Sequence, residues 1–95
     1  QIRVQGQKSG KPVCLDNYIN APGLTESFET HGITHESFLT GQSAFLFTKL
    51  FVNNKISAQG VFPPEVLDAD AREYYLKEAA DLGITVNEIV ETRLY

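Results

Sequence analysis

Apolar and polar residues alternate at both ends of the chain. The alternation covers residues 2–6 and 13–19, and a stretch rich in turn-forming residues, 7–11, lies between the two runs. A period of two is typical of a half-buried strand, so residues 1–19 predict a β-hairpin with a loop of about five residues. Residues 84–95 alternate in the same way and predict a long final strand.

The most apolar segment of the chain predicts a helix over residues 41–53. From residue 44 onward, only Thr48 and Lys49 interrupt its run of apolar side chains. These side chains point in almost every direction around the predicted helix, and a helix that is apolar on most sides is buried on most sides. The residues that form this wide apolar surface are Phe45, Leu46, Phe47, Leu50 and Phe51.

A second helix is predicted after a stiff corner at Pro63 and Pro64. Asp70 and Glu73 match the capping box D-x-x-E, and Gly83 provides a stop, so the helix is expected to begin at Asp70 and to end before Gly83. Its apolar residues fall on one side, as in an ordinary surface helix.

Together these elements predict an α+β fold. We expect a mostly antiparallel mixed sheet of three to four strands, with two main helices packed on one face. Residues 20–34 have a weak pattern and are interpreted as a connection with one helical turn at residues 25–29. The length suits a single domain, residues 1–95. Because the chain begins with Gln1 rather than methionine, we expect a fragment of a larger enzyme.

Composition excludes several classes of partner. Eight Lys and Arg residues are scattered among twelve Asp and Glu, with a net charge of -4, so no basic stripe is available to nucleic acid. No apolar run approaches the roughly 20 residues of a membrane span. The single cysteine, Cys14, is interpreted as a packing residue and not as a nucleophile, and cytoplasm is the expected location.

No metal site is expected. His31 and His35 are four residues apart, a spacing that places two imidazoles on one face of a helix. Gly32, Ile33 and Thr34 lie between them and disfavour a helix there, and no further His or Cys is placed to complete a tetrahedral set. We therefore interpret the histidines as solvated or locally hydrogen-bonded residues.

The wide apolar surface of the first helix predicts an interface. A 95-residue chain offers little material to cover such a helix on every side. A second subunit or another domain is expected to cover the rest, since large exposed apolar patches usually mark interfaces. The expected interface residues are Phe45, Leu46, Phe47, Leu50 and Phe51.

A polar turn at the predicted start of the same helix is a candidate substrate site. Free backbone N–H groups and the helix dipole at a helix N-terminus can hold a carboxylate or a phosphate. The simpler alternative is that Thr40 or Ser43 only caps the helix. No catalytic set and no G-x-G-x-x-G motif is visible elsewhere in the chain. The candidate residues are Thr40, Gly41, Gln42 and Ser43.

Residues 34–85 resemble the C-terminal, non-Rossmann region of saccharopine dehydrogenase-like oxidoreductases. The resemblance lies in Thr40-Gly41 before an apolar helix, in Lys55-Ile56, and in the corner Gly60 to Glu65. It implies a substrate-binding and dimerisation domain of an NAD(P)-dependent oxidoreductase that acts on CH–NH donors. It also implies that NAD(P) is bound by a separate Rossmann domain, so no cofactor and no catalytic residue is expected in this chain.

Two hypotheses therefore remain open. The resemblance favours a domain of an oxidoreductase that is inactive alone, forms a homodimer and contacts its own Rossmann domain. The alternative, which the apolar helix by itself favours, is a noncatalytic homo-oligomeric interaction module.

Overall fold

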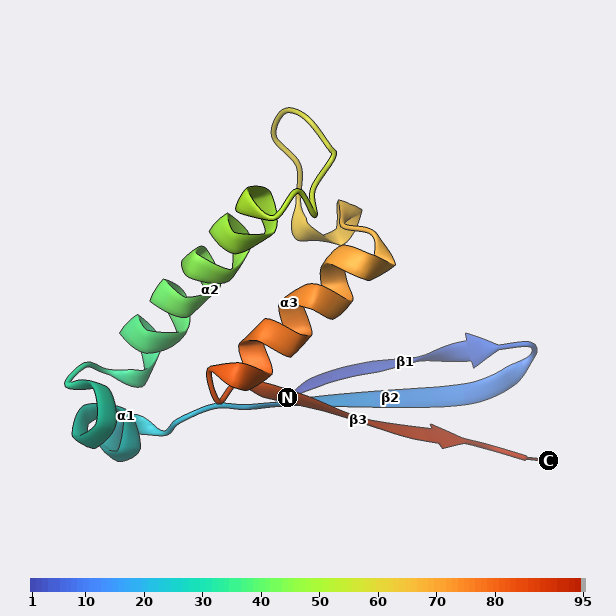
Figure 1. Cartoon of the computed structure of the whole chain (residues 1–95). Coiled ribbons are helices and arrows are strands. Elements are labelled where there is room, and N and C mark those ends of the chain that lie inside the picture. Colours follow the sequence, from blue (N-terminus) through green and yellow to red (C-terminus); the bar gives the residue numbers. More distant parts are fainter. Residues whose placement is uncertain (95) are drawn as a thin grey trace.

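The computed structural model describes residues 1–94, which form a three-stranded sheet and a set of helices (Figure 1). The strands pair in the order β1-β2-β3, and both pairs are antiparallel. The predicted α+β fold is thereby confirmed, and the last helix leads into an antiparallel strand. The elements are β1 (Ile2–Lys8), β2 (Lys11–Asn20), α1 (Leu24–His31), α2 (His35–Val52), the 3-10 helix η1 (Pro64–Val66), α3 (Ala69–Asp81) and β3 (Thr85–Thr92).

The turn between β1 and β2 is tighter than predicted. Lys8 pairs directly with Lys11, which leaves Ser9 and Gly10 as a two-residue turn. Both have positive φ, 52° and 75°, as the two central positions of a type I′ turn require. The expected loop of about five residues is wrong, because the strand pairing continues to the last residue on each side.

Helix α2 begins six residues before its predicted start at Gly41. Thr34 is the N-cap, and its side-chain oxygen accepts a hydrogen bond from the backbone N–H of Ser37 at 3.2 Å. Gly41 lies inside the helix, where a glycine costs only about 1 kcal/mol relative to alanine. The long apolar face of the helix outweighs that cost.

Helix α3 also begins earlier than its predicted capping box at Asp70. Asp68 is the N-cap, and its Oδ1 accepts a hydrogen bond of 2.8 Å from the N–H of Ala71. Gly83 follows the end of the helix and has a positive φ of 81°, in agreement with the predicted stop. Helix α1 is a full helix of eight residues where a single turn was expected, and it ends at Gly32 in the left-handed conformation.

The core of the domain lies between the helices. Helices α2 and α3 run side by side, and α1 packs against the start of α2 (Figure 1). The buried apolar side chains within residues 1–94 come from these two longer helices. They are Phe38, Leu46, Leu50, Ala71 and Ala79.

The sheet extends away from this helical core. It joins the helices where α3 leads into β3, and the hairpin end of β1 and β2 reaches out with no helix beside it (Figure 1). Ile19 and Val86, at the end of the sheet nearest the helices, are exposed as well. The helices therefore leave the sheet largely uncovered.

This arrangement makes the molecule extended for its size. The radius of gyration is 16.4 Å, whereas a compact domain of this length has a radius of gyration of about 12 Å. The accessible surface is 7244 Å², against about 5,500 Å² for a typical monomer of this mass, an excess of about 1,800 Å². Much apolar surface is left open to solvent.

Candidate functional site

Helix α2 has a buried side and an exposed side. Leu46 and Leu50 face α3 and are 2% and 0% exposed. Phe45, Phe51 and Val52 are exposed, and we call these three residues the α2 outer face. Of the expected interface residues, Leu46 and Leu50 are thus used within the chain, and Phe45 and Phe51 remain available to a partner.

Phe47, the other expected interface residue, belongs to the seam between α2 and α3. Its ring packs on that of Tyr75 with the ring centroids 5.0 Å apart. Beside this contact, the ammonium of Lys49 forms an ion pair with Glu78, and its hydrogen bond to Glu78 raises the pKa of Lys49. One aromatic contact and one ion pair therefore fix α2 against α3, which holds the α2 outer face toward solvent.

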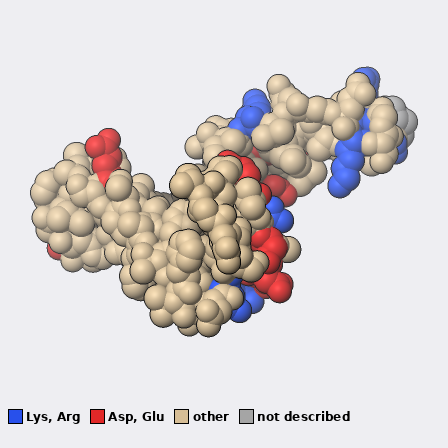
Figure 2. Space-filling view, turned by 90° about the horizontal axis from the view of Figure 1, so that it is seen from above, with Lys and Arg blue, Asp and Glu red and all other residues tan. Residues whose placement is uncertain are grey.

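Charged side chains are unevenly distributed over the molecule. Figure 2 shows the face seen from above, where a broad central area holds no Lys, Arg, Asp or Glu. Helix α2 itself carries only Glu36 and Lys49 as charged residues, and Lys49 is paired with Glu78. A surface with little charge around exposed aromatic side chains is typical of the centre of a protein–protein contact.

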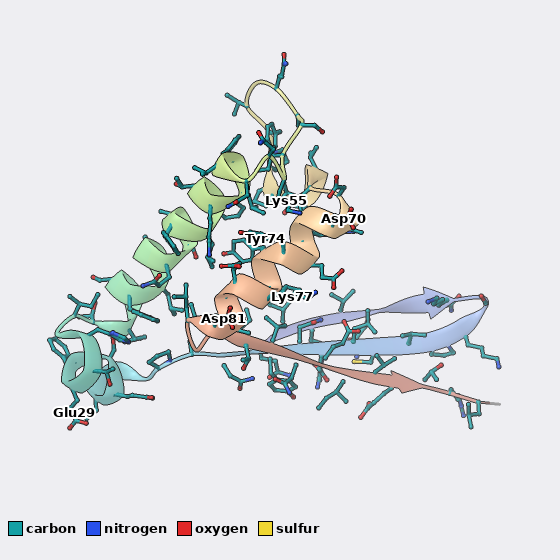
Figure 3. The ribbon with its side chains drawn as sticks, in the orientation of Figure 1. Glu29, Lys55, Asp70, Tyr74, Lys77 and Asp81 are labelled. Atoms are coloured by element: carbon teal, nitrogen blue, oxygen red, sulfur yellow. The ribbon has the colours of Figure 1, made fainter. Side chains whose placement is uncertain are left out.

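The predicted corner forms the tip of the helical pair. Lys55 reaches back over the ring of Tyr74, with its Nζ 5.3 Å from the ring centroid (Figure 3). Near this corner, η1, α2 and α3 border an open hollow of about 430 Å³. The hollow is lined by Phe47, Pro64, Glu65, Leu67, Arg72, Tyr75 and Leu76. It is mainly apolar, with Arg72 and Glu65 as its charged residues.

The predicted substrate residues Thr40, Gly41, Gln42 and Ser43 lie in the middle of α2. In an α-helix each backbone N–H beyond the first turn donates to the carbonyl four residues earlier, so the N–H groups of these residues are already bonded. These four residues do not lie at a helix start, as the sequence predicted, because α2 begins at His35. Only their side chains are left to contact a substrate.

The histidines and the cysteine are not brought together with other ligands. His31 ends α1 and stacks on Phe38 with ring centroids 4.4 Å apart, whereas His35 begins α2. Cys14 is half-buried in the central strand. Over the described chain, no cluster of three or more His, Cys, Asp or Glu residues has the geometry to hold a metal ion.

A second open apolar surface, which the sequence did not predict, lies on the sheet. The pairing registers place Val4, Leu15 and Val90 in one row across the three strands, and Gly6, Val13 and Thr92 in the next. Directly paired residues point to the same side of a sheet. Val4 and Val90 are exposed. We call these two rows the sheet apolar face.

The opposite face of the sheet is polar and internally paired. Arg3 donates two hydrogen bonds to the carboxylate of Asp16, at 2.8 and 2.9 Å, and Gln1 donates a third at 3.0 Å. These bonds keep the pKa of Asp16 below its usual range, with the Arg3 hydrogen bond as the main cause. The charged groups Arg3 and Asp16 on this face are therefore paired within the chain, whereas Val4 and Val90 on the sheet apolar face are exposed to solvent.

Comparison with family models, curated proteins and solved structures finds no match to this chain. Among the helices of residues 1–94, none combines the length and the apolar character needed to cross a bilayer. The two open apolar surfaces and the residues that surround them are therefore the features that bear on function.

Proposed function

We propose that this chain is the substrate-binding and dimerisation domain of a saccharopine dehydrogenase-like, NAD(P)-dependent oxidoreductase that acts on CH–NH donors. The observation that supports an association role is the excess of exposed surface, about 1,800 Å² beyond that of a typical monomer of this mass. A standard protein–protein contact buries about 800 Å² on each partner. The excess is sufficient for two such contacts.

Two separate apolar surfaces support two separate partners. The α2 outer face belongs to the helical core, and the sheet apolar face belongs to the extended sheet. In the proposed enzyme, one surface contacts the Rossmann domain of the same chain and the other contacts a second subunit. A domain placed between two partners is expected to have little internal core, as is the case here.

The cofactor belongs to another part of the proposed enzyme. Dinucleotides bind to parallel βαβ units at a glycine-rich turn. Both strand pairs within residues 1–94 are antiparallel, so the residues described here do not fit an NAD(P) site of that type. This chain would contribute substrate contacts and assembly, and it would not transfer hydride alone.

The substrate role rests on the resemblance of residues 34–85 to the enzyme family. The corner from Gly60 to Glu65 is the most specific part of that resemblance. Pro64 and Glu65 line the hollow at the tip of the helical pair, and Gly60, Val61 and Phe62 line a neighbouring hollow of about 420 Å³. Gln42 and Ser43 are half-buried on α2 and offer side-chain hydrogen bonds only. A cytoplasmic location is part of the same proposal.

A noncatalytic homo-oligomeric module is the second candidate. The same excess of exposed apolar surface supports it, because association alone explains that surface without any chemistry. The two candidates differ in what surrounds the domain in the whole protein: the oxidoreductase requires a neighbouring Rossmann unit, and the module does not.

Deletion of this domain from the protein encoded by the whole reading frame separates the candidates. For the oxidoreductase, we expect the remainder to retain NAD(P)H binding, measured by fluorescence, and to lose both dimerisation and amine oxidation. A reading frame without a G-x-G-x-x-G Rossmann unit would contradict the oxidoreductase and leave the module. A remainder that stays dimeric would contradict the association role itself.

A further inference from the structure

Basic and acidic side chains flank the sheet apolar face at opposite ends. Lys8 and Lys11 pair across the hairpin turn, at the free end of the sheet. Glu88 pairs with Asn17 at the end nearer to the helices. Lys11 is four residues from Leu15 along β2, and Glu88 is two residues from Val90 along β3. Even spacings place them on the same side of the sheet as the apolar rows.

All of these side chains line one hollow on this side of the sheet. It has a volume of about 590 Å³, and its lining includes Lys8, Lys11 and Glu88 together with Val4, Val13, Leu15 and Val90. Within residues 1–94, no salt bridge of the chain involves any of these three charged groups. Along the strands the order is therefore a basic row, two apolar rows and an acidic row.

We propose that a second copy of this chain covers the sheet apolar face, with its strands antiparallel to those of the first copy. In this arrangement the row of Lys8 and Lys11 in each copy lies at the same level as Glu88 of the other copy, and Lys11 is one strand across from that Glu88. The inference rests on the proposed association function, and it specifies the partner and the register of one of the two surfaces.

The spacing of the rows is symmetric enough for a two-fold contact. Lys11 and Asn17, which mark the basic and acidic rows on β2, are six residues apart, or about 20 Å along a strand. A two-fold axis that crosses β2 midway, at the level of Cys14, places Val13 of one copy opposite Leu15 of the other. Sheets that pack face to face are about 10 Å apart, within reach of Lys and Glu side chains from both sides.

Charge favours a second copy in this orientation over other occupants. A dimer with parallel strands would bring Lys11 against Lys11 and would leave both Glu88 carboxylates at the same end of the contact without a basic partner. Like charges placed together across an interface cost several kcal/mol. A purely acidic or purely basic partner would match only one end of the surface. The chain itself has a basic end and an acidic end on this surface. A two-fold contact between two copies places the basic end of each copy against the acidic end of the other.

Variants that reverse the charges of the basic and acidic residues test the register of the dimer. One variant carries Glu88→Lys, and the other carries Lys8→Glu together with Lys11→Glu. Each variant alone has like charges at both ends of the contact. We expect its dimer to be at least about tenfold weaker than that of the unchanged chain in sedimentation equilibrium.

The decisive step is an equimolar mixture of the two variants. In the mixed dimer both ends regain opposite charges, so we expect a heterodimer about as tight as the original homodimer. The triple variant, with all three changes in one chain, is expected to form homodimers again. The triple variant also tests the register if circular dichroism shows that either simpler variant does not fold.

Glu29→Lys is the matched control, because Glu29 lies on α1 far from the sheet hairpin (Figure 3). It is expected to leave the dimer unchanged. If the unchanged chain is a dimer and the mixture or the triple variant does not restore association, the register is overturned and the association function stands. If the unchanged chain is monomeric at every concentration, both are overturned.

Discussion

Leu50 and Phe51 are adjacent on helix α2, yet Leu50 is 0% exposed against α3 whereas Phe51 is 57% exposed to solvent. Two large apolar residues in one helix thus have different roles. Leu50 stabilises the chain, and Phe51 is available to a partner.

Alanine substitutions are expected to separate these roles. Leu50→Ala should lower the free energy of unfolding by about 2–5 kcal/mol, because it leaves a cavity between the helices. Phe51→Ala should change the stability of the dilute chain by about 0.5 kcal/mol or less, as for most exposed positions. Urea denaturation measures both. Equal losses for the two variants would contradict the assignment of the α2 outer face.

The true start of α2 gives a second prediction. Thr34→Ala removes the side-chain oxygen that accepts from the N–H of Ser37, and it should cost about 1 kcal/mol of stability. Thr40→Ala is the matched control, because Thr40 lies inside the helix and alanine is the better helix former. A larger loss for Thr40→Ala than for Thr34→Ala in thermal unfolding would place the start where the sequence predicted it.

The ion pair of Arg3 and Asp16 predicts a specific acid sensitivity. The pKa of Asp16 is held below its ordinary value of 3.8 in the folded chain, mainly by the Arg3 hydrogen bond. Its contribution to stability is therefore fully present above that value and is lost as the pH falls through the lower, folded pKa. As the pH is lowered through this range, the urea midpoint of the Asp16→Asn variant should fall less steeply than that of the unchanged chain. Parallel curves for the two proteins would contradict the assignment.

The turn between β1 and β2 predicts a stabilising substitution. Ser9 occupies a position with φ of 52°, which asparagine adopts more readily than serine, and Asn-Gly is a favoured pair for a type I′ turn. Ser9→Asn should raise the thermal midpoint slightly. A lower midpoint would argue against the two-residue turn. Gly10→Ala, at a φ of 75°, is expected to lower it.

Much of the fold followed from residue patterns, and the helix starts did not. The period-two runs and the apolar segment located the strands and α2 correctly. The start at Thr34 was missed because Gly41 and the polar residues before it resemble a helix boundary. Phe38, which is buried and stacks on His31 of α1, provides tertiary packing that favours the longer helix.

The candidate surfaces were predictable only in part. A helix that is apolar in all directions favours an interface, and it does not indicate which residues face inward, so Leu46 and Phe45 could not be distinguished. The sheet apolar face was hidden for a different reason. Val4, Leu15 and Val90 are far apart in the sequence, and only the strand register brings them into one row.

The central claim is that this chain folds as an association domain whose open apolar surfaces are covered by partners. Sedimentation equilibrium over a concentration series tests it most directly. We predict a reversible change from the 10.6 kDa chain at low concentration to twice that mass at micromolar concentration. A folded chain that retains the monomer mass throughout the series would contradict the account.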